Sequence, residues 1–410
     1  MQAATSDERE PIGGSGEPAA LARDIRRHLL STLGTDDRSP NAFRVYKALA
    51  YAVRDRLIES WIATQRSYYE SGAKRVYYLS LEFLPGRFLL ANLTSLGLVE
   101  AARQAVGERG LALEEVAEQE WEAGLGNGGL GRLASCYLDS LATLGIPAHG
   151  YGIRYDYGIF YQLIRDGWQV ERPDNWLRAG NPWEFERPEH LYEVSFGGQV
   201  VTRTDEQGRL CFDWVGSSNV MAMACDILIP GFRNGNAINM RLWAARSSRE
   251  FELGFFNSGN YVGAIEDKIR SENISRVLYP SETVRQGREL RLQQEYFFVS
   301  ATFQDIMRRF RKSGAPITAL PELVAVQLND THPAIAIAEL MRLLVDGERM
   351  PWETAWELCV RTFGYTNHTV MPEALEHWPV EMLQRMLPRH LQIIFEINRR
   401  FLDEVAIRHP

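Results

Sequence analysis

The chain has 410 residues, of which 45% are hydrophobic, so it can bury a large core as one large domain or as two or three ordinary ones. Its net charge of −8 and its lack of a basic tract argue against a nucleic-acid partner. The sequence has no leader of the secretory or transit type and no apolar run of membrane-spanning length, which predicts a cytoplasmic protein without a membrane partner.

The four cysteines are far apart in the sequence and form no CxxC pair and no Cys/His spacing suited to zinc. We therefore expect reduced core residues and no metal site. They are Cys136, Cys211, Cys225 and Cys359.

In chain order, the pattern predicts a mobile tail over residues 1–20, a helical region over 21–71 and an α/β domain over 72–410. The α/β domain contains two short apolar runs that predict buried strands and a stretch of short alternating patterns that predicts a β-rich insertion. Two long helices follow the insertion. The ranges are 76–81 and 323–328 for the strands, 193–231 for the insertion, and 260–278 and 287–311 for the helices.

The run GLGNGGLGR at 124–132 places five glycines directly before an amphipathic helix that Gly145 ends. Glycines permit positive φ and close approach of backbone N–H groups to a ligand, while a helix N-terminus attracts anions. The run therefore predicts a cradle for a phosphate or sugar oxygen. The glycines are Gly124, Gly126, Gly128, Gly129 and Gly131, and the apolar helix positions are Leu133, Tyr137, Leu138, Leu141 and Leu144.

Other interpretations of this run are weaker. A dinucleotide-binding loop needs a buried strand before the first glycine, but the preceding EEVAEQEWEA is acidic and helix-like. A nucleotide-triphosphate loop needs a Lys-Ser or Lys-Thr pair, which does not follow. A tightly packed glycine turn without a ligand remains a structural alternative.

Polar residues follow three predicted strand or helix ends, where open α/β sheets bind ligands. Glu82 follows the first strand as either a solvent-facing carboxylate or a cleft residue. After the second strand, Asp330 or Thr331 could cap the next helix, which leaves Asn329 and His332 without a structural task.

The third polar segment, Tyr365 to Thr369, contains Asn367 and His368. A lone histidine is more often a satisfied, partly buried residue, but its polar neighbours favour a site. We expect all three segments to converge on the glycine run.

These residues resemble the α-glucan phosphorylases, the family of glycogen and maltodextrin phosphorylases. The resemblance extends from about Lys47 to the end of the chain. Its motifs are YYLSLEFLPGR, GLGNGGLGRLASCYLDSLATLGIPAHGYGIRYDYGIF, DNWLRAGNPWE, ENISRVLYP, LRLQQEYFFVSAT, QLNDTHPA, YTNHTVMPEALEHWP and LPRHLQIIFEINRRF.

The resemblance implies a two-domain enzyme of the GT-B type, in which both domains are doubly wound and Rossmann-like and pyridoxal phosphate lies between them. The implied reaction is phosphorolysis of the terminal α-1,4-linked glucose of glycogen or maltodextrin by inorganic phosphate, which releases glucose 1-phosphate. The implied proton donor and acceptor is the phosphate of the cofactor, so the protein positions the reactants and stabilises charge.

The resemblance also implies roles for particular residues. The backbone of Gly128, Gly129 and Leu130 corresponds to the phosphate-binding loop, and His368 corresponds to a residue that contacts the glucosyl unit. Asp330 and Glu82 correspond to acids that order waters and sugar-binding loops. Further predicted gate and sugar residues are Glu282, Thr283, His332 and Asn367.

A nucleotide effector site is a weaker implication. It would use aromatic residues to stack a base and arginines to hold a phosphate, but a helix surface with a basic last turn explains the same residues. The residues are Trp61, Gln65, Tyr69, Arg308 and Arg309.

The lysine that binds pyridoxal phosphate belongs to the C-terminal domain of the family, and this sequence ends before it. We therefore expect a truncated or split phosphorylase that is inactive alone and whose full-length form is a homodimer. The alternative is a non-catalytic glucan-binding or interaction module built on half of the fold.

Overall fold

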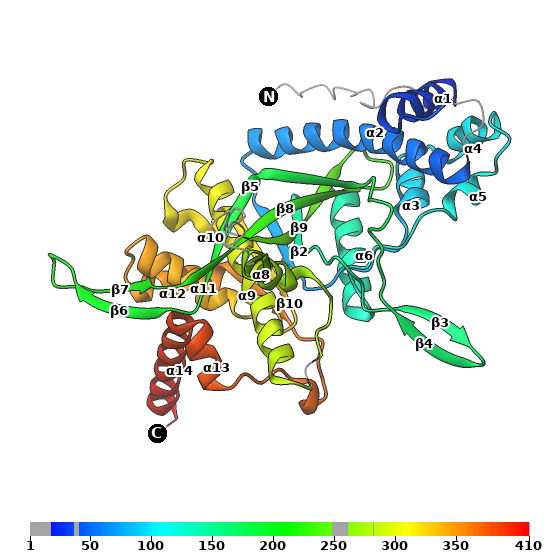
Figure 1. The fold of residues 1–410 in the computed structure, drawn as a ribbon. Coiled ribbons are helices and arrows are strands. Elements are labelled where there is room, and N and C mark those ends of the chain that lie inside the picture. The colour runs from blue at the N-terminus through cyan, green and yellow to red at the C-terminus, as the bar shows by residue number, and fades with distance from the viewer. Residues whose placement is uncertain (1–17, 37–40, 248–260, 282, 410) are drawn as a thin grey trace, which may run out of the picture.

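The computed structural model describes residues 18–36, 41–247, 261–281 and 283–409, and among them it contains a seven-stranded mixed sheet (Figure 1). The first five strands in spatial order are parallel, and the last two pair antiparallel at one edge. In spatial order the strands are β11 (Phe363–Thr366), β10 (Val324–Asn329), β1 (Arg75–Leu79), β2 (Ala148–Ile153), β9 (Ala237–Ser247), β8 (Ser218–Pro230) and β5 (Glu184–Phe196).

The order of the parallel strands reverses between β1 and β10. From β1 the chain proceeds to β2 and β9 on one side, and it later returns to place β10 and β11 on the other side. Open α/β sheets bind ligands at such a switch point, beyond the carboxyl ends of the strands. Both strands that the sequence predicts are present, and they are the two neighbours at this point.

Helices cover both faces of the sheet. Successive strand residues point to opposite faces, so neighbouring residues of one strand contact different helices. On one face Gly150 of β2 lies against Leu138 of α6 (Gly129–Thr143). On the other face Tyr151 donates a 2.6 Å hydrogen bond to Asp305 of α9 (Arg285–Arg311). The predicted α/β class is therefore confirmed as a mixed sheet between helices.

The predicted helical region near the N-terminus contains α1 (Pro18–Arg27), a π-helical turn (His28–Thr32) and α2 (Ala42–Glu70). The side chain of Asn41 caps α2 by accepting a 2.9 Å bond from the Arg44 N–H. Of the predicted tail, residues 1–17 lie outside the described ranges. In Figure 1, α2 runs along the top of the molecule, and it packs against β8 and β9.

The remaining helices connect or flank the strands. They are α3 (Phe88–Ser95), α4 (Val99–Gly107), α5 (Leu113–Ala117), α8 (Tyr261–Glu272), α10 (Leu320–Leu323), α11 (Ala336–Arg342), α12 (Trp352–Thr362), α13 (Val380–Met386) and α14 (Pro388–Arg408). The helix predicted over 260–278 ends at Glu272, and a short 3₁₀ turn over Asn273–Ser275 follows.

The predicted β-rich insertion over 193–231 is wrong in part, because β5 and β8 extend the central sheet through β9. Alternating patterns identify antiparallel strands but do not tell which sheet they join. Separate from this sheet are the hairpins β3 (Tyr161–Arg165) with β4 (Trp168–Arg172) and β6 (Gln199–Thr204) with β7 (Leu210–Val215), both of which project from the body in Figure 1.

Two further expectations need correction on α6. Cys136 is exposed rather than buried, whereas the other three cysteines are buried, and all four are free thiols. Of the predicted apolar stripe, Leu138 is buried but Leu133, Tyr137 and Leu144 are exposed, because one flank of α6 has no covering element among the described residues. No helix in the described ranges is long and apolar enough to cross a bilayer.

Candidate active site

Three polar segments meet at the carboxyl edge of the sheet, on both sides of the switch point. Glu82 follows β1, Asp330 follows β10, and His368 follows β11. These strands are adjacent and parallel, so their ends point to the same edge. The hydrogen bonds described below join the segments to one another and to the glycine run, as the sequence predicts.

Three glycines of the run serve close packing. A Cβ on Gly126 would lie 2.8 Å from the carbonyl carbon and oxygen of Phe83, and one on Gly124 would lie 2.5 Å from the Trp176 ring. A Cβ on Gly131 would lie 3.1 Å from the carboxylate of Glu82. The packed-turn interpretation therefore holds for these three positions, where a side chain would displace the loop.

The other two glycines face open space. Gly128 and Gly129 are exposed, and a Cβ at either position would have no neighbouring atom within 4 Å among the described residues. Gly128 is the N-cap of α6 and has no side chain to occupy the helix N-terminus. Backbone N–H groups and the positive end of the helix dipole thus face outward, as anion binding requires.

The expected positive φ is absent from these glycines. Gly128 has φ −143°, and positive-φ glycines in the described chain include Gly145 but no member of the run. The glycines are needed for access and close approach, not for a left-handed turn. The helix-like segment before the run is α5, so a dinucleotide loop preceded by a buried strand is ruled out.

Glu82 holds the glycine run against the strand ends. Its side chain is buried, and its carboxylate accepts a 2.8 Å hydrogen bond from the backbone N–H of Asn127. A buried carboxylate that accepts a backbone N–H fixes the position of that peptide more strongly than a neutral acceptor would. Of the two alternatives for Glu82, the structure supports the buried residue rather than a solvent-facing carboxylate.

Asp330 joins β10 to β11. Its N–H donates to the Thr366 carbonyl at 2.8 Å, and its carboxylate accepts the Thr331 N–H and the Thr369 hydroxyl, each at 2.9 Å. Its φ of 70° is unusual for a residue other than glycine, although aspartate tolerates this region. Neither Asp330 nor Thr331 caps α11, which begins later, at Ala336.

His368 and His332 lie on either side of this segment. The Nε2 atom of half-buried His368 lies 2.6 Å from Oδ1 of Asn329. The side chain of His332 is 15% exposed, and its Nε2 lies 4.0 Å from the carboxylate of Glu376. Burial and the charge of Arg291 lower the pKa of His332 to about 4, so its ring is neutral near pH 7.

Glu376 and Arg291 complete the cluster, although they are not among the predicted site residues. Glu376 accepts a 2.8 Å hydrogen bond from the Thr331 hydroxyl, and Arg291 lies 3.8 Å from it. Burial raises the pKa of Glu376, but Glu295, His332 and Arg291 lower it by more. Neither residue follows a predicted strand, so the strand-end pattern did not indicate them. The sequence pointed to them only through the motifs EALEHWP and LRLQQEY, which contain them.

Two predicted sugar or gate residues do not join the cluster. Both side-chain atoms of Asn367 bond to the Thr369 backbone at 3.0 Å, which shapes the loop. Thr283 is exposed and its hydroxyl lies 2.8 Å from that of Ser281, and no hydrogen bond among the described residues links it to the strand ends. Glu282 lies outside the described residues.

The predicted nucleotide residues are only partly together. Arg308 and Arg309 both pair with buried Asp305, at 2.6 and 2.9 Å, which supports the structural interpretation. Tyr69 and Arg309 line one small hollow of about 230 Å³, whose lining does not include Trp61 or Gln65. The nucleotide site stays a prediction.

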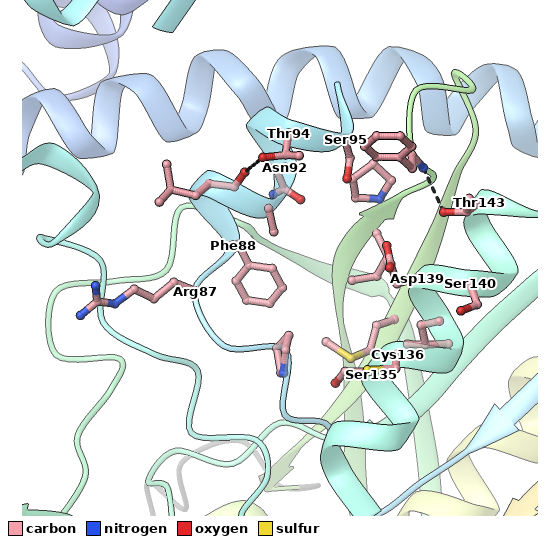
Figure 2. Close-up of a pocket in the computed structure, with 18 of the residues that line it drawn as sticks. Arg87, Phe88, Asn92, Thr94, Ser95, Ser135, Cys136, Asp139, Ser140 and Thr143 are labelled. Carbon is pink, nitrogen blue, oxygen red and sulfur yellow. Dashed lines mark hydrogen bonds between the residues drawn. The ribbon is translucent and has the colours of Figure 1, made fainter. Parts of the chain in front are cut away.

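A separate hollow lies between α3 and the open flank of α6 (Figure 2). It has a volume of about 800 Å³. Phe88 lines it from one side, and Cys136 and Asp139 of α6 line it from the other. The helix that carries the open glycines thus also carries one wall of this hollow.

Comparison with known proteins agrees with this geometry. Residues 106–410 match the model of the carbohydrate phosphorylase family. The chain is 52% identical to a glycogen phosphorylase of Chlamydia pneumoniae over 391 residues, 95% of this chain and 48% of that protein. It is 52% identical to the human liver form over 407 residues, 97% of this chain and 48% of that protein.

A third relative, the muscle form of Ovis aries, is likewise 52% identical over 407 residues. The chain spans about half the length of each of these relatives. The family match covers most of the chain and includes the glycine run and the polar segments of Asp330 and His368, whereas Glu82 precedes the matched range. The chain therefore belongs to the carbohydrate phosphorylase family.

Proposed function

We propose that this chain supplies one wall of an α-1,4-glucan phosphorylase site, which transfers a terminal glucosyl unit of glycogen or maltodextrin to inorganic phosphate. The proposal rests on one observation: two glycines with exposed backbone lie next to the polar residues that follow β1, β10 and β11 at the switch point. Gly128 and Gly129 are exposed beside a helix N-terminus, and Glu82 ties their loop to the sheet.

The division of tasks follows from chemistry. Backbone N–H groups at a helix N-terminus bind a phosphate without adding a charge that must be desolvated. Hydroxyl-rich sugars need convergent donors and acceptors, which His368 and the Asp330 loop supply. The packing of Gly124, Gly126 and Gly131 holds both groups in fixed relation.

Pyridoxal phosphate fits the residues present only in part. The open glycine N–H groups suit a phosphate, but within the described structure none of the four lysines forms a hydrogen bond or ion pair with the site residues. Lys47, for example, donates to the Ala179 carbonyl at 2.8 Å, far along the chain from the strand ends. When bound, the cofactor would supply a phosphate able to give and take a proton, and its amine partner would come from another domain.

We further propose that the second half of the full-length protein forms the facing domain of a GT-B-like enzyme. The exposed flank of α6 suits such a contact, because Leu133, Tyr137 and Leu144 are large apolar residues left open. A homodimer of the full-length protein is part of the same proposal.

The test is an assay of glucose 1-phosphate release from maltoheptaose with phosphate and pyridoxal phosphate. The chain is assayed alone, mixed with the second half of the Chlamydia pneumoniae relative, and joined to that half. We expect activity only when the second half is present, and a large loss on His368→Ala without unfolding. Glucan binding without activity in a folded, joined protein would favour the non-catalytic module.

A further inference from the structure

A buried hydrogen-bond chain runs from His368 to the backbone of Glu82 through Asn329, the last residue of β10, and Ser80, which follows β1. Nε2 of His368 lies 2.6 Å from Oδ1 of Asn329, and Nδ2 of Asn329 lies 2.9 Å from Oγ of Ser80. Ser80 in turn donates to the Glu82 carbonyl at 2.7 Å. Asn329 is 1% and Ser80 0% exposed, so water does not replace these partners.

The single hydroxyl proton of Ser80 sets the polarity of the whole chain. A carbonyl oxygen can only accept, so Ser80 gives its proton to Glu82. The Ser80 oxygen can then only accept, and it does so from the Glu82 N–H at 3.3 Å and from Asn329. Asn329 must therefore present its NH₂ group to Ser80 and its oxygen to the other side.

The Asn329 oxygen faces two groups, and both must be donors. The Tyr78 hydroxyl donates to it at 2.9 Å, and Nε2 of His368 approaches it at 2.6 Å. A nitrogen that faces an amide oxygen carries the proton. In the neutral ring Nδ1 then keeps its lone pair, and it makes no hydrogen bond to any of the described residues.

We infer that Asn329 is a positioning residue that holds His368 as the Nε2–H tautomer, and that Ser80 fixes the orientation of the Asn329 amide. His368 then presents an acceptor at Nδ1 to a ligand hydroxyl. The same chain ends at Glu82, whose carboxylate holds the Asn127 N–H of the glycine loop at 2.8 Å. Glu82 thus takes part in both arrangements, with its backbone carbonyl in the chain from the histidine and its carboxylate on the glycine loop.

The tautomer of His368 can be measured without any enzyme activity, whereas its contribution to catalysis rests on the proposed function. The first measurement is therefore spectroscopic and uses the 410-residue chain labelled with ¹⁵N-histidine. We expect a protonated Nε2, an unprotonated Nδ1, and an imidazole N–H proton that exchanges slowly because its partner is buried. A native chain with the Nδ1–H tautomer, or with a charged ring near neutral pH, would overturn the inference.

Three variants test which residue holds the tautomer of His368. Asn329→Leu removes the acceptor, and we expect the protected N–H signal to vanish and both tautomers to appear. Ser80→Ala frees the amide to rotate, so we expect partial loss. Tyr78→Phe is the matched control, because it removes the other donor to the same oxygen and leaves the histidine bond. An unchanged His368 spectrum in folded Asn329→Leu would contradict the role of Asn329.

Phosphorylase activity, measured in the chain joined to the second half of the relative, separates the positioning role of Asn329 from the proposed function. We expect Asn329→Leu to lower kcat by about tenfold to a hundredfold, as for other losses of alignment, with a smaller effect on the KM for phosphate. If the tautomer is found but the joined protein has no phosphorylase activity, the proposed function fails and the hydrogen-bond chain stands. If activity is found and Asn329→Leu leaves kcat unchanged, the positioning role fails alone.

Discussion

Substitution of Gly126 by alanine separates packing from ligand access within the glycine run. The new methyl group would lie 2.8 Å from the carbonyl carbon and oxygen of Phe83, which are backbone atoms that cannot rotate away. The loop must shift, and Asn127, the next residue, would be drawn off the Glu82 carboxylate. Gly129→Ala is the matched control, because a Cβ there has no neighbour within 4 Å in the described structure.

Of the two substitutions, only Gly126→Ala should destabilise the fold. Overpacking costs about 1–3 kcal/mol, and loss of a hydrogen bond to a charged group adds about 1.5–3 kcal/mol. We therefore expect Gly126→Ala to lower the free energy of unfolding by about 2–6 kcal/mol. Gly129→Ala lies in the first turn of α6 and should be neutral or stabilise by up to about 1 kcal/mol.

The assay is urea unfolding followed by tryptophan fluorescence, with the midpoint and slope compared between variants. The reasoning is refuted if Gly126→Ala unfolds at the same urea concentration as the parent chain. It is equally refuted if Gly129→Ala costs as much as Gly126→Ala, since that position would then be packed.

Three further predictions follow. Asp330 has φ 70°, so Asp330→Val should unfold about 1–2 kcal/mol more easily than Asp330→Asn, and equal urea midpoints would contradict this. The pKa of His332 is about 4 in the folded chain, against an ordinary 6.5, so between these pH values the unfolded chain binds more protons than the folded one. Acidification from pH 6.5 to 4 should therefore lower the free energy of unfolding by up to about 3 kcal/mol. His332→Leu should lose that part of the slope of unfolding free energy against pH, and an unchanged slope would exclude it. Asp305→Ala removes the buried carboxylate that Arg241, Arg308 and Arg309 share and should cost about 3–5 kcal/mol in urea unfolding. Asp213→Ala, at an exposed pair with Arg203, should change little; equal effects would show that Asp305 is not a structural anchor.

The sequence was sufficient to place the strand ends. The apolar runs before Glu82 and Asn329 predict buried strands, which the structure contains, and parallel strands bring their carboxyl ends to one edge. Their order in the sheet was not predictable, so the switch point between β1 and β10 emerged only from the structure. The same holds for β5 and β8, which a local pattern could not assign to the central sheet.

Long-range partners limited what could be foreseen at the site. Glu376 reaches Thr331 from 45 positions along the chain, and no local pattern encodes that contact. The sequence could not tell which of the five glycines are packed and which are open. That distinction depends on the positions of Phe83, Trp176 and Glu82 in the fold. The expected positive φ was wrong, because close packing explains Gly124, Gly126 and Gly131, and Gly128 and Gly129 leave the helix N-terminus accessible.

The interpretation that Gly128 and Gly129 bind phosphate is tested most directly by ¹⁵N-glycine labelling of the 410-residue chain and titration with glucose 1-phosphate. We expect weak, saturable shifts of the Gly128 and Gly129 amides, with Gly129→Ala to assign them. Glycine signals remote from the strand ends, such as that of Gly72 beside Tyr69 and Arg309, should stay in place. Shifts at Gly72 with none at Gly128 and Gly129 would place the anion site elsewhere and contradict the proposed function.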